Sequence, residues 1–238
     1  MTLVPQNSLQ SLDPLFRVGH QVAEPLVVHK GLSWAAAMEA AIKLLSDVRI
    51  PAARLRARSY PFQMSGGMRQ RAASAAAVGP DPSILIADEP TTALDVTVQE
   101  GILRLLISLS EQRQMSVLFV SHDLGVIRFV CDRVAVIYGG QIVETGWVED
   151  VIANPKHRYT NALLAANPGM PKDANFSAFI GQRLQTIPGS VPAVGNFPTG
   201  CRFRNRCAHA TEACTATPEP VTVGRDHRYS CWNPAAEE

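Results

Sequence analysis

The chain contains 238 residues, of which 46% are hydrophobic and 18% charged, so a disordered or fibrous protein is excluded and a globular one is expected. Its 22 basic and 21 acidic side chains give a formal net charge of +1, whereas nucleic-acid-binding proteins usually carry an excess of positive charge. No run of about 18 apolar residues is present, and the N-terminus lacks a basic-then-apolar export signal. We therefore expect a chain that neither binds nucleic acid nor crosses a membrane.

A first helix is predicted over residues 33–48. Apolar side chains recur there at helical spacing, beginning with Trp34 and Met38. Ser33 suits the N-cap of this helix, and Pro51 suits a stop beyond its end. We therefore expect an amphipathic helix in the N-terminal third of the chain.

A parallel crossover is predicted further along the chain. The short apolar runs Ser83–Ala87 and Ser116–Val120 lack polar alternation, which is typical of strands buried on both faces. Residues 97–113 lie between them and have helical periodicity. A strand, a helix and a strand in this order predict a right-handed crossover in a parallel sheet.

An antiparallel hairpin is predicted after this crossover. Apolar residues at 133–138 and 141–145 flank Gly139 and Gly140, a pair suited to a tight turn. We expect this hairpin to complete the sheet. Proline and glycine become frequent after Asn167, which indicates a domain boundary near that residue.

Three polar residues follow the two predicted strands. Asp88 and Glu89 come directly after the first strand, and His122 comes after the second. Ligands bind beyond the carboxyl ends of strands in an open parallel sheet, so these residues are site candidates. Adjacent carboxylates suit magnesium-dependent phosphoryl chemistry, in which one holds the hydrated metal and the other polarises a water. The alternative is that they are ordinary strand-end residues that face solvent.

A second candidate site is the sequence Ser65–Gly66–Gly67, which precedes an alanine-rich helical stretch. Amides and a hydroxyl at a helix N-terminus form an anion-binding geometry. A serine-capped helix after a glycine turn is the alternative, and it would explain these three residues without a ligand.

The chain carries three motifs in a fixed order: SGGMRQR at 65–71, ILIADEPTTALD at 84–95 and SHD at 121–123. In this order and spacing they resemble the nucleotide-binding subunit of ATP-binding-cassette (ABC) transporters. The resemblance implies an α/β fold with a RecA-like parallel sheet, truncated at its N-terminal side, and an inserted helical subdomain. It also implies a small irregular C-terminal segment rich in cysteine.

The same resemblance implies roles for individual residues, with ATP and Mg²⁺ as cofactors. SGGMRQ is the signature motif, DE the Walker B pair, TALD the D-loop, and VPQN at 4–7 the Q-loop. The implied catalytic residues are Glu89, His122 and Gln6. The implied nucleotide-binding residues are Ser65, Gly66, Gly67, Gln70, Asp88 and Asp95. Mg²⁺ would be held by Asp88 and Gln6.

Further segments look like dipeptide and oligopeptide importer ATPases: SLQSLDP at 8–14, NPKHRYTNALL at 154–164, PGSVP at 188–192 and GCRFRNRC at 200–207. Arg158 departs from this pattern, since those importers usually carry a proline there. A soluble cassette ATPase of DNA repair or translation is disfavoured, because no coiled-coil insertion separates the motifs.

The likeness implies a domain division. Residues 1–165 would form a partial nucleotide-binding domain, with a helical subdomain over about 15–80 and the Walker B and switch part over 81–165. Residues 166–238 would form a regulatory segment. The implied partners are a different second ATPase subunit, a membrane permease and, indirectly, a substrate-binding protein. The implied location is the cytoplasmic side of the cell membrane.

A phosphate loop, GxxxxGK followed by Ser or Thr, is absent from the sequence. We therefore expect negligible ATP affinity for the chain alone, although its signature motif can close over a nucleotide that a partner subunit holds. A shortened gene model is one explanation. The alternative is a non-hydrolysing subunit that donates its signature motif to an intact ATPase.

Four of the five cysteines fall near the C-terminus: Cys201, Cys207, Cys214 and Cys231. Without an export signal their thiols stay reduced, which favours a metal site over disulfides. The spacing C-x5-C-x6-C-x16-C lacks the CxxC of most structural zinc sites. Four thiolates can also hold a [4Fe-4S] cluster, and the resemblance favours this cluster over zinc. Reduced cysteines without a ligand are the third alternative. The remaining histidines, His157 and His209 among them, show no ligand spacing.

Overall fold

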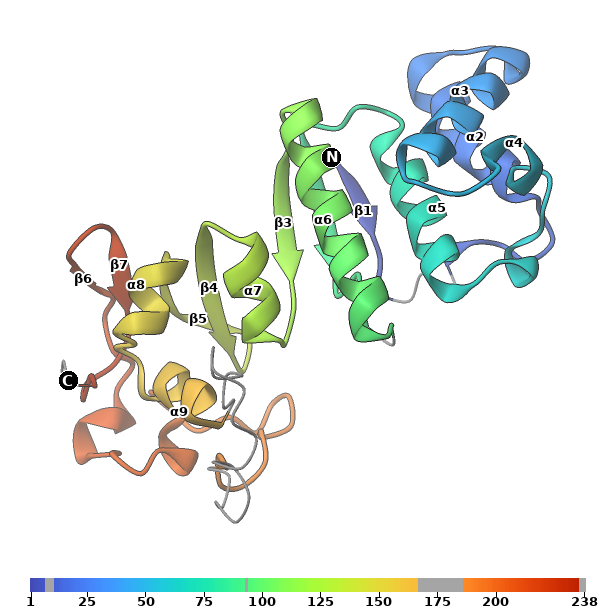
Figure 1. The fold of residues 1–238 in the computed structure, drawn as a ribbon. Helices are drawn as coiled ribbons and strands as arrows, with labels where there is room; N and C mark the ends of the chain where they lie inside the picture. Colours follow the sequence, from blue (N-terminus) through green and yellow to red (C-terminus); the bar gives the residue numbers. More distant parts are fainter. Residues whose placement is uncertain (7–10, 93, 167–185, 236–238) are drawn as a thin grey trace, which may run out of the picture. The chain divides into compact units, whose positions relative to one another are not determined.

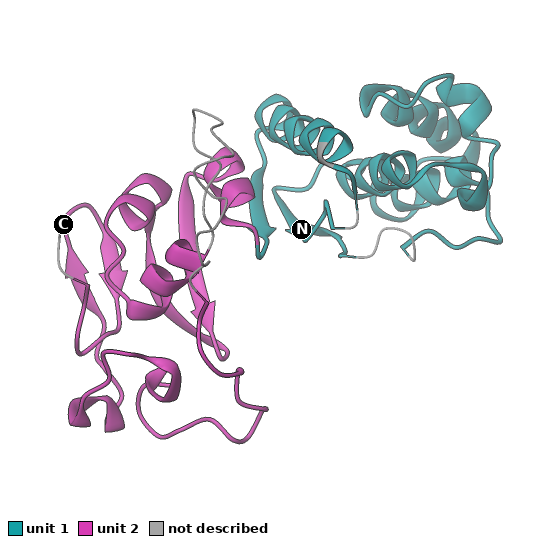
Figure 2. Ribbon diagram, turned by 60° about the horizontal axis from the view of Figure 1, so that its bottom comes forward, with its two compact units in different colours: residues 1–122 teal, residues 123–238 magenta. Residues whose placement is uncertain are grey.

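The computed structural model describes residues 1–6, 11–92, 94–166 and 186–235. Residues 7–10 of the Q-loop and SLQSLDP motifs, Ala93 of the D-loop and the start of the predicted C-terminal segment lie outside this part. The chain divides into two compact units, residues 1–122 and 123–238 (Figure 2). Within the described residues, no helix is long and apolar enough to cross a membrane.

The N-terminal unit contains a helical region between its first and second strands (Figure 1). Its helices are α2 (Val18–Lys30), α3 (Trp34–Asp47), α4 (Ala53–Arg56), the short 3-10 helix η1 (Pro61–Gln63) and α5 (Gly66–Val78). The prediction of a helix after Ser33 is confirmed, because the Ser33 side chain accepts a hydrogen bond from the Ala36 amide at 3.3 Å. Small side chains allow α3 and α5 to pack closely, and several of their alanines are fully buried.

The same unit contains a parallel sheet of β1 (Thr2–Val4), β2 (Ile84–Asp88) and β3 (Ser116–Val120), in that order. Helix α6 (Val96–Arg113) connects β2 to β3, so the predicted parallel crossover is confirmed. The prediction that both faces of the strands are buried is wrong for β3, whose Leu118 and Val120 are exposed in the unit.

The register of this sheet places three strand ends side by side. Val4 of β1 pairs with Ala87, and Asp88 pairs with Val120 of β3. Residues that directly follow the strands therefore meet at one edge of the sheet, as expected for parallel strands. This edge positions the first candidate site.

The C-terminal unit contains helices α7 (Leu124–Val130), α8 (Val148–Ala153) and α9 (Arg158–Ala166), and the short 3-10 helices η3 (Arg204–Arg206) and η4 (Glu212–Thr215). Its strands are β4 (Arg133–Tyr138), β5 (Gln141–Trp147), β6 (Val221–Val223) and β7 (His227–Tyr229). Tyr138, Tyr159 and Phe203 pack in its small core, with ring centroids 4.7–5.3 Å apart.

The predicted hairpin is confirmed, with Gly139 and Gly140 at its turn, both at positive φ. Its predicted place in the sheet is wrong. Among the described strands, β4 and β5 belong to an antiparallel sheet of order β4-β5-β7-β6, separate from the parallel one. The hairpin is hydrogen-bonded to the C-terminal segment, because β7 pairs with β5.

A buried carboxylate holds this C-terminal segment in place. The Glu144 side chain of β5 accepts hydrogen bonds from the backbone amides of Lys156 at 2.6 Å and His157 at 3.0 Å. Its Oε1 also lies 2.7 Å from Nε2 of His227 in β7. One carboxylate thus joins β5, the segment before α9 and β7, which together position the cysteine-bearing residues.

Candidate functional site

The ends of β1, β2 and β3 bring together three residues that the sequence analysis selected. Gln6 Nε2 donates to Glu89 Oε2 at 2.8 Å, and His122 Nδ1 lies 2.9 Å from Glu89 Oε1. A fourth residue joins them, because the Thr92 hydroxyl donates to Glu89 Oε2 at 2.8 Å. We call Gln6, Glu89, Thr92 and His122 the Glu89 cluster.

The cluster stabilises the ionised form of Glu89. Hydrogen bonding from His122, then from Thr92 and then from Gln6 lowers the pKa of the Glu89 carboxyl below its ordinary value. Glu89 also has a φ of 42°, an uncommon conformation for a residue with a side chain. Its amide donates to the Val120 carbonyl at 2.9 Å, which fixes the start of this turn against β3. The carboxylate is therefore charged and held at the sheet edge.

The two other carboxylates have different surroundings. Asp88 ends β2 and is half-buried at the same sheet edge. Asp95 is the N-cap of α6, where its Oδ1 accepts a hydrogen bond from the Val98 amide at 2.9 Å. Asp95 therefore stabilises the helix that begins the crossover, and its nucleotide-binding role stays a prediction.

The predicted signature motif begins helix α5. Ser65 is exposed and caps the helix, accepting from the Met68 amide at 3.3 Å. Gly66 and Gly67 form the first turn, and a Cβ on Gly67 would lie 2.7 Å from Val98 Cγ1. Gly67 therefore allows α5 to approach α6 closely. This packing role would exist with or without a nucleotide.

Gln70 of α5 is buried, unlike the capping serine. Its side chain is 2% exposed, and its Nε2 has no hydrogen-bond partner among the described residues. Gln70 is thus placed in the interior of the unit, and its predicted contact with nucleotide stays a prediction.

Thr92 is the residue of the cluster that the sequence analysis did not select as a site residue. Its amide donates to the Glu89 carbonyl at 3.1 Å, which closes a turn that brings the two side chains together. The sequence does contain a signal for Thr92, because its hydroxyl comes three residues after a predicted catalytic carboxylate in a segment that favours a turn.

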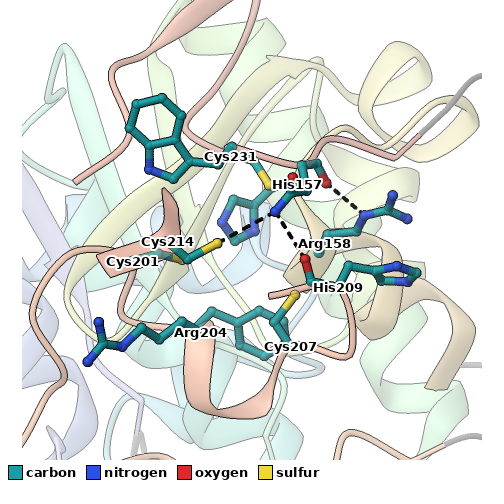
Figure 3. Close-up of a pocket in the computed structure, with 11 residues that line it drawn as sticks. His157, Arg158, Cys201, Arg204, Cys207, His209, Cys214 and Cys231 are labelled. Carbon is teal, nitrogen blue, oxygen red and sulfur yellow. Dashed lines mark hydrogen bonds between the residues drawn. The ribbon is translucent and has the colours of Figure 1, made fainter. Parts of the chain in front are cut away.

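The C-terminal unit contains a second candidate site, a small cavity of about 10 Å³. Its wall includes all four C-terminal cysteines: Cys201, Cys207, Cys214 and Cys231. Figure 3 shows the sulfurs of Cys207, Cys214 and Cys231 turned toward a common space. The structure therefore brings together cysteines that are spread over 31 positions of the sequence.

Two of these thiols, Cys201 and Cys207, favour their neutral form in the chain alone. Burial raises the pKa of Cys201 and of Cys207 above the ordinary value of a thiol. Among the described residues, no three His, Cys, Asp or Glu side chains are arranged to hold a metal ion as they stand. The donor types fit a thiolate-bound metal, whereas the cavity has room for little more than one water. A cluster would therefore require the cysteine side chains to rotate outward.

His157 also lines this cavity, although its spacing gave no reason to select it. Its side chain is 1% exposed, and desolvation lowers its pKa to about 4. Its Nδ1 accepts from the Tyr159 amide at 3.0 Å, whereas its Nε2 has no partner among the described residues. A buried donor without an acceptor is uncommon and calls for an explanation.

A sheet edge with a held glutamate and a histidine after the next strand is typical of an ATP-binding cassette. The solved structures of the cassette MJ0796 are of this class. Its dimer in a post-hydrolysis state bound to ADP and Pi has a TM-score of 0.54 and 30% identity, covering 62% of this chain and 63% of that one. A second dimeric structure of this bacterial ABC transporter cassette has a TM-score of 0.54 and 31% identity, with 62% of each chain covered.

The chain belongs to the peptide import ATP-binding proteins of ABC transporters. The ABC transporter family model matches residues 1–92, and the model of the oligopeptide/dipeptide transporter C-terminal region matches residues 143–214. A putative peptide import ATP-binding protein of Brucella melitensis is 48% identical over 230 residues, covering 96% of this chain and 68% of the relative. One of Brucella abortus is also 48% identical, over 228 residues and 67% of its length. The resemblance inferred from the motifs is thus confirmed.

Proposed function

We propose that this chain supplies half of a shared nucleotide clamp that energises peptide import at the cytoplasmic side of the cell membrane. The observation that carries this proposal is the Glu89 cluster at the carboxyl edge of the parallel sheet. Family membership supports ATP and Mg²⁺ as its cofactors. Asp88 and the amide oxygen of Gln6 have the oxygen donors that Mg²⁺ prefers, and both belong to this edge.

We propose that Oε1 of Glu89 acts as the base, and the hydrogen bonds of the carboxylate support this choice of oxygen. A carboxylate oxygen has two lone pairs. Oε2 accepts from both Gln6 and Thr92, whereas Oε1 accepts only from His122 among the contacts described. The remaining lone pair on Oε1 can accept a proton from an attacking water, while Thr92 and Gln6 hold the carboxylate in place. Bound Mg²⁺-ATP would supply the phosphoryl group and the charge neutralisation that this step requires.

The clamp needs a second subunit. Residues 1–238 contain no phosphate loop, so a triphosphate bound only by these side chains would lack most of the groups that neutralise its charge. Ser65, Gly66 and Gly67 at the N-terminus of α5 can still close over phosphates that a companion ATPase subunit holds. The dimeric state named for both MJ0796 structures supports such an assembly. The other proposed partners are a permease and, through it, a substrate-binding protein.

The first test is calorimetric titration of the isolated 238-residue chain with Mg²⁺-ATP, together with a phosphate-release assay. We expect no measurable binding and no turnover. Tight binding or hydrolysis by the chain alone would contradict the shared clamp.

Ser65 and Ser33 form a matched pair for the second test. Both are exposed N-cap serines that accept one amide hydrogen bond at 3.3 Å. Replacing either with alanine costs about 1 kcal/mol of helix stability. In the complex with a companion ATPase and the permease, Ser65→Ala should lower ATP turnover at least tenfold, and Ser33→Ala should leave it within twofold. Equal turnover in both variants would exclude signature donation.

A non-hydrolysing subunit that only donates its signature motif is the alternative. Its supporting observation is the serine-capped SGG start of α5, which can donate its hydroxyl and amides to a nucleotide that another subunit holds. Glu89→Gln discriminates the two functions in the same complex. If this chain hydrolyses ATP, the variant lowers turnover at its own site. If it only donates Ser65, the variant leaves turnover unchanged while Ser65→Ala still lowers it.

For the second site, we propose that Cys201, Cys207, Cys214 and Cys231 hold a [4Fe-4S] cluster, with zinc as the alternative. The support is their common cavity and the guanidinium-bearing residues around it, since Arg158 and Arg204 also line the wall. Iron and zinc per chain should be measured after anaerobic purification. About four irons and a brown colour are expected, a colourless protein with one zinc would favour the alternative, and neither metal would exclude both.

A further inference from the structure

His157 presents a hydrogen-bond donor to the cysteine-lined cavity. The backbone amide of Tyr159 donates to His157 Nδ1 at 3.0 Å, so this nitrogen carries no proton. The proton of the neutral ring is therefore on Nε2. This Nε2–H is buried and has no acceptor among the described residues, although hydroxyl, carbonyl and sulfur atoms are common neighbours in a protein interior.

The ring is fixed in this orientation from both sides. The His157 backbone amide donates to the buried Glu144 carboxylate at 3.0 Å, which anchors the residue to β5. The contact with the Tyr159 amide fixes the rotation of the ring. Phe203, which also lines the cavity, packs near the imidazole with a centroid separation of 6.2 Å. The unpartnered Nε2–H is therefore a built feature of the cavity wall.

The other histidine of the wall is different. His209 is exposed, and Figure 3 shows its ring directed away from the sulfurs, whereas the His157 ring lies among them. Two histidines thus line the same cavity, of which only His157 combines burial with a donor that lacks an acceptor. His209 provides a control at the same site.

We infer that His157 donates its Nε2 proton to a thiolate sulfur of the four-cysteine site when that site holds its metal. The inference rests on the proposed metal site. Four thiolates around one metal centre bring negative charge into a buried place, where an N–H donor stabilises them. His157 acts as a positioning residue and not as a ligand, because Nε2 carries the proton and the lone pair of Nδ1 accepts from Tyr159.

The test compares four variants of the full chain, purified anaerobically. His157→Gln keeps an N–H donor near the place of Nε2, and His157→Asn keeps an acceptor near the place of Nδ1. His157→Leu removes both groups, and His209→Leu is the matched control. Metal content is measured first, followed by the midpoint potential of the cluster in a redox titration monitored by electron paramagnetic resonance.

Hydrogen bonds to sulfur favour the reduced state of an iron–sulfur cluster. We therefore expect His157→Leu and His157→Asn to lower the reduced-to-oxidised ratio about tenfold, or about 59 mV for one electron. His157→Gln and His209→Leu should stay near the wild-type potential. If the metal is zinc, competition with a chelator replaces the potential, and the same two variants should lose about tenfold in affinity.

The outcomes distinguish the role of His157 from the existence of the metal site. A wild-type chain that binds neither iron nor zinc overturns the metal site itself. A metal-loaded chain whose potential or affinity is unchanged in His157→Leu overturns only the role of His157. If His157→Leu does not fold, the comparison of His157→Gln with His157→Asn provides the test. A wild-type potential or affinity in His157→Asn, together with a shifted one in His157→Gln, would mean that the contact with the Tyr159 amide matters and the Nε2 donor does not.

Discussion

His122 Nδ1 lies 2.9 Å from Oε1 of Glu89, although the two residues are 33 positions apart in the sequence. The parallel register of β2 and β3 creates this contact, because it sets Asp88 beside Val120. His122 is 76% exposed in its side chain, so it can turn toward another acceptor without disturbing the core. Glu89 is more enclosed and is held by two further donors. The histidine is therefore the less constrained member of the pair.

Thr92→Val should raise the pKa of Glu89 toward its ordinary value. The Thr92 hydroxyl donates to Glu89 Oε2 at 2.8 Å and so favours the ionised form, and valine keeps the shape of the side chain without this donor. The pKa can be followed by a ¹³C NMR titration of the Glu89 carboxyl in the full chain. Thr97→Val, at an exposed position of α6, is the control. An unchanged Glu89 titration in Thr92→Val would show that the hydroxyl does not act on the carboxylate.

Glu144→Gln should destabilise the C-terminal unit by about 2 kcal/mol, because an amide group replaces one oxygen of a buried acceptor. Both carboxylate oxygens of Glu144 are hydrogen-bonded: Oε1 to the Lys156 amide and His227, and Oε2 to the His157 amide. Urea unfolding is best followed by tryptophan fluorescence in a Trp34→Phe background, which leaves Trp147 and Trp232, both in the C-terminal unit.

The control for this prediction is Glu149→Gln, at an exposed position of α8. We expect it to change the unfolding free energy by a few tenths of a kcal/mol, as is usual for surface substitutions. Equal effects at the two positions would mean that the buried carboxylate does not anchor β7 and the segment before α9.

Much of the N-terminal unit follows from local sequence patterns. Helix α3 with its Ser33 cap and helix α6 are specified by the helical spacing of their apolar residues, and strand β2 by its short unbroken apolar run. Glu89 and His122 were found because parallel strands end at a common edge. The fold class inferred from the motifs is confirmed by the cassette structures.

The C-terminal unit follows less directly from sequence. Strands β6 and β7 have three residues each, too few for a periodic pattern to be recognised. The pairing of β7 with β5 is accompanied by the contact between Glu144 and His227, which are 83 positions apart. His157 could not be selected from the sequence either. It stands out because it is buried and its Nε2 has no partner among the described residues, and residue spacing predicts neither property.

Gly200→Ala should disrupt the cysteine-lined cavity. Gly200 has a φ of 75°, and a Cβ there would lie 2.5 Å from the backbone of Cys214 and Thr215. Gly195 also has a positive φ, of 92°, but a Cβ there would have no neighbour within 4 Å. Gly195→Ala therefore serves as the control, because it introduces the backbone strain of about 1–2 kcal/mol without the clash. Only Gly200→Ala should also speed the reaction of the buried Cys214 with a thiol reagent, and similar rates in both variants would contradict the steric argument.

Asp81→Asn should lower the stability of the N-terminal unit at neutral pH and leave it unchanged in acid. The Asp81 carboxylate contacts Lys30 at the end of α2 and Arg113 at the end of α6, and the hydrogen bond from Lys30 contributes most to lowering its pKa. Because the side chain of Asp81 is 58% exposed, solvent screening limits the loss to about 1 kcal/mol. Asparagine also tolerates the left-handed backbone that Asp81 adopts, at a φ of 53°.

The pH dependence of this difference follows from the sign of the pKa shift. A carboxyl whose folded-state pKa is lowered contributes stability above its unfolded pKa of about 3.9, and this contribution is lost as the pH falls through the folded value. Urea unfolding of the wild type and Asp81→Asn should therefore differ at pH 7 and converge below about pH 3.9. Glu24→Gln, at an exposed position of α2, should match the wild type at both pH values. A difference between wild type and Asp81→Asn that persisted undiminished in strong acid would mean that the charge of Asp81 does not stabilise the unit.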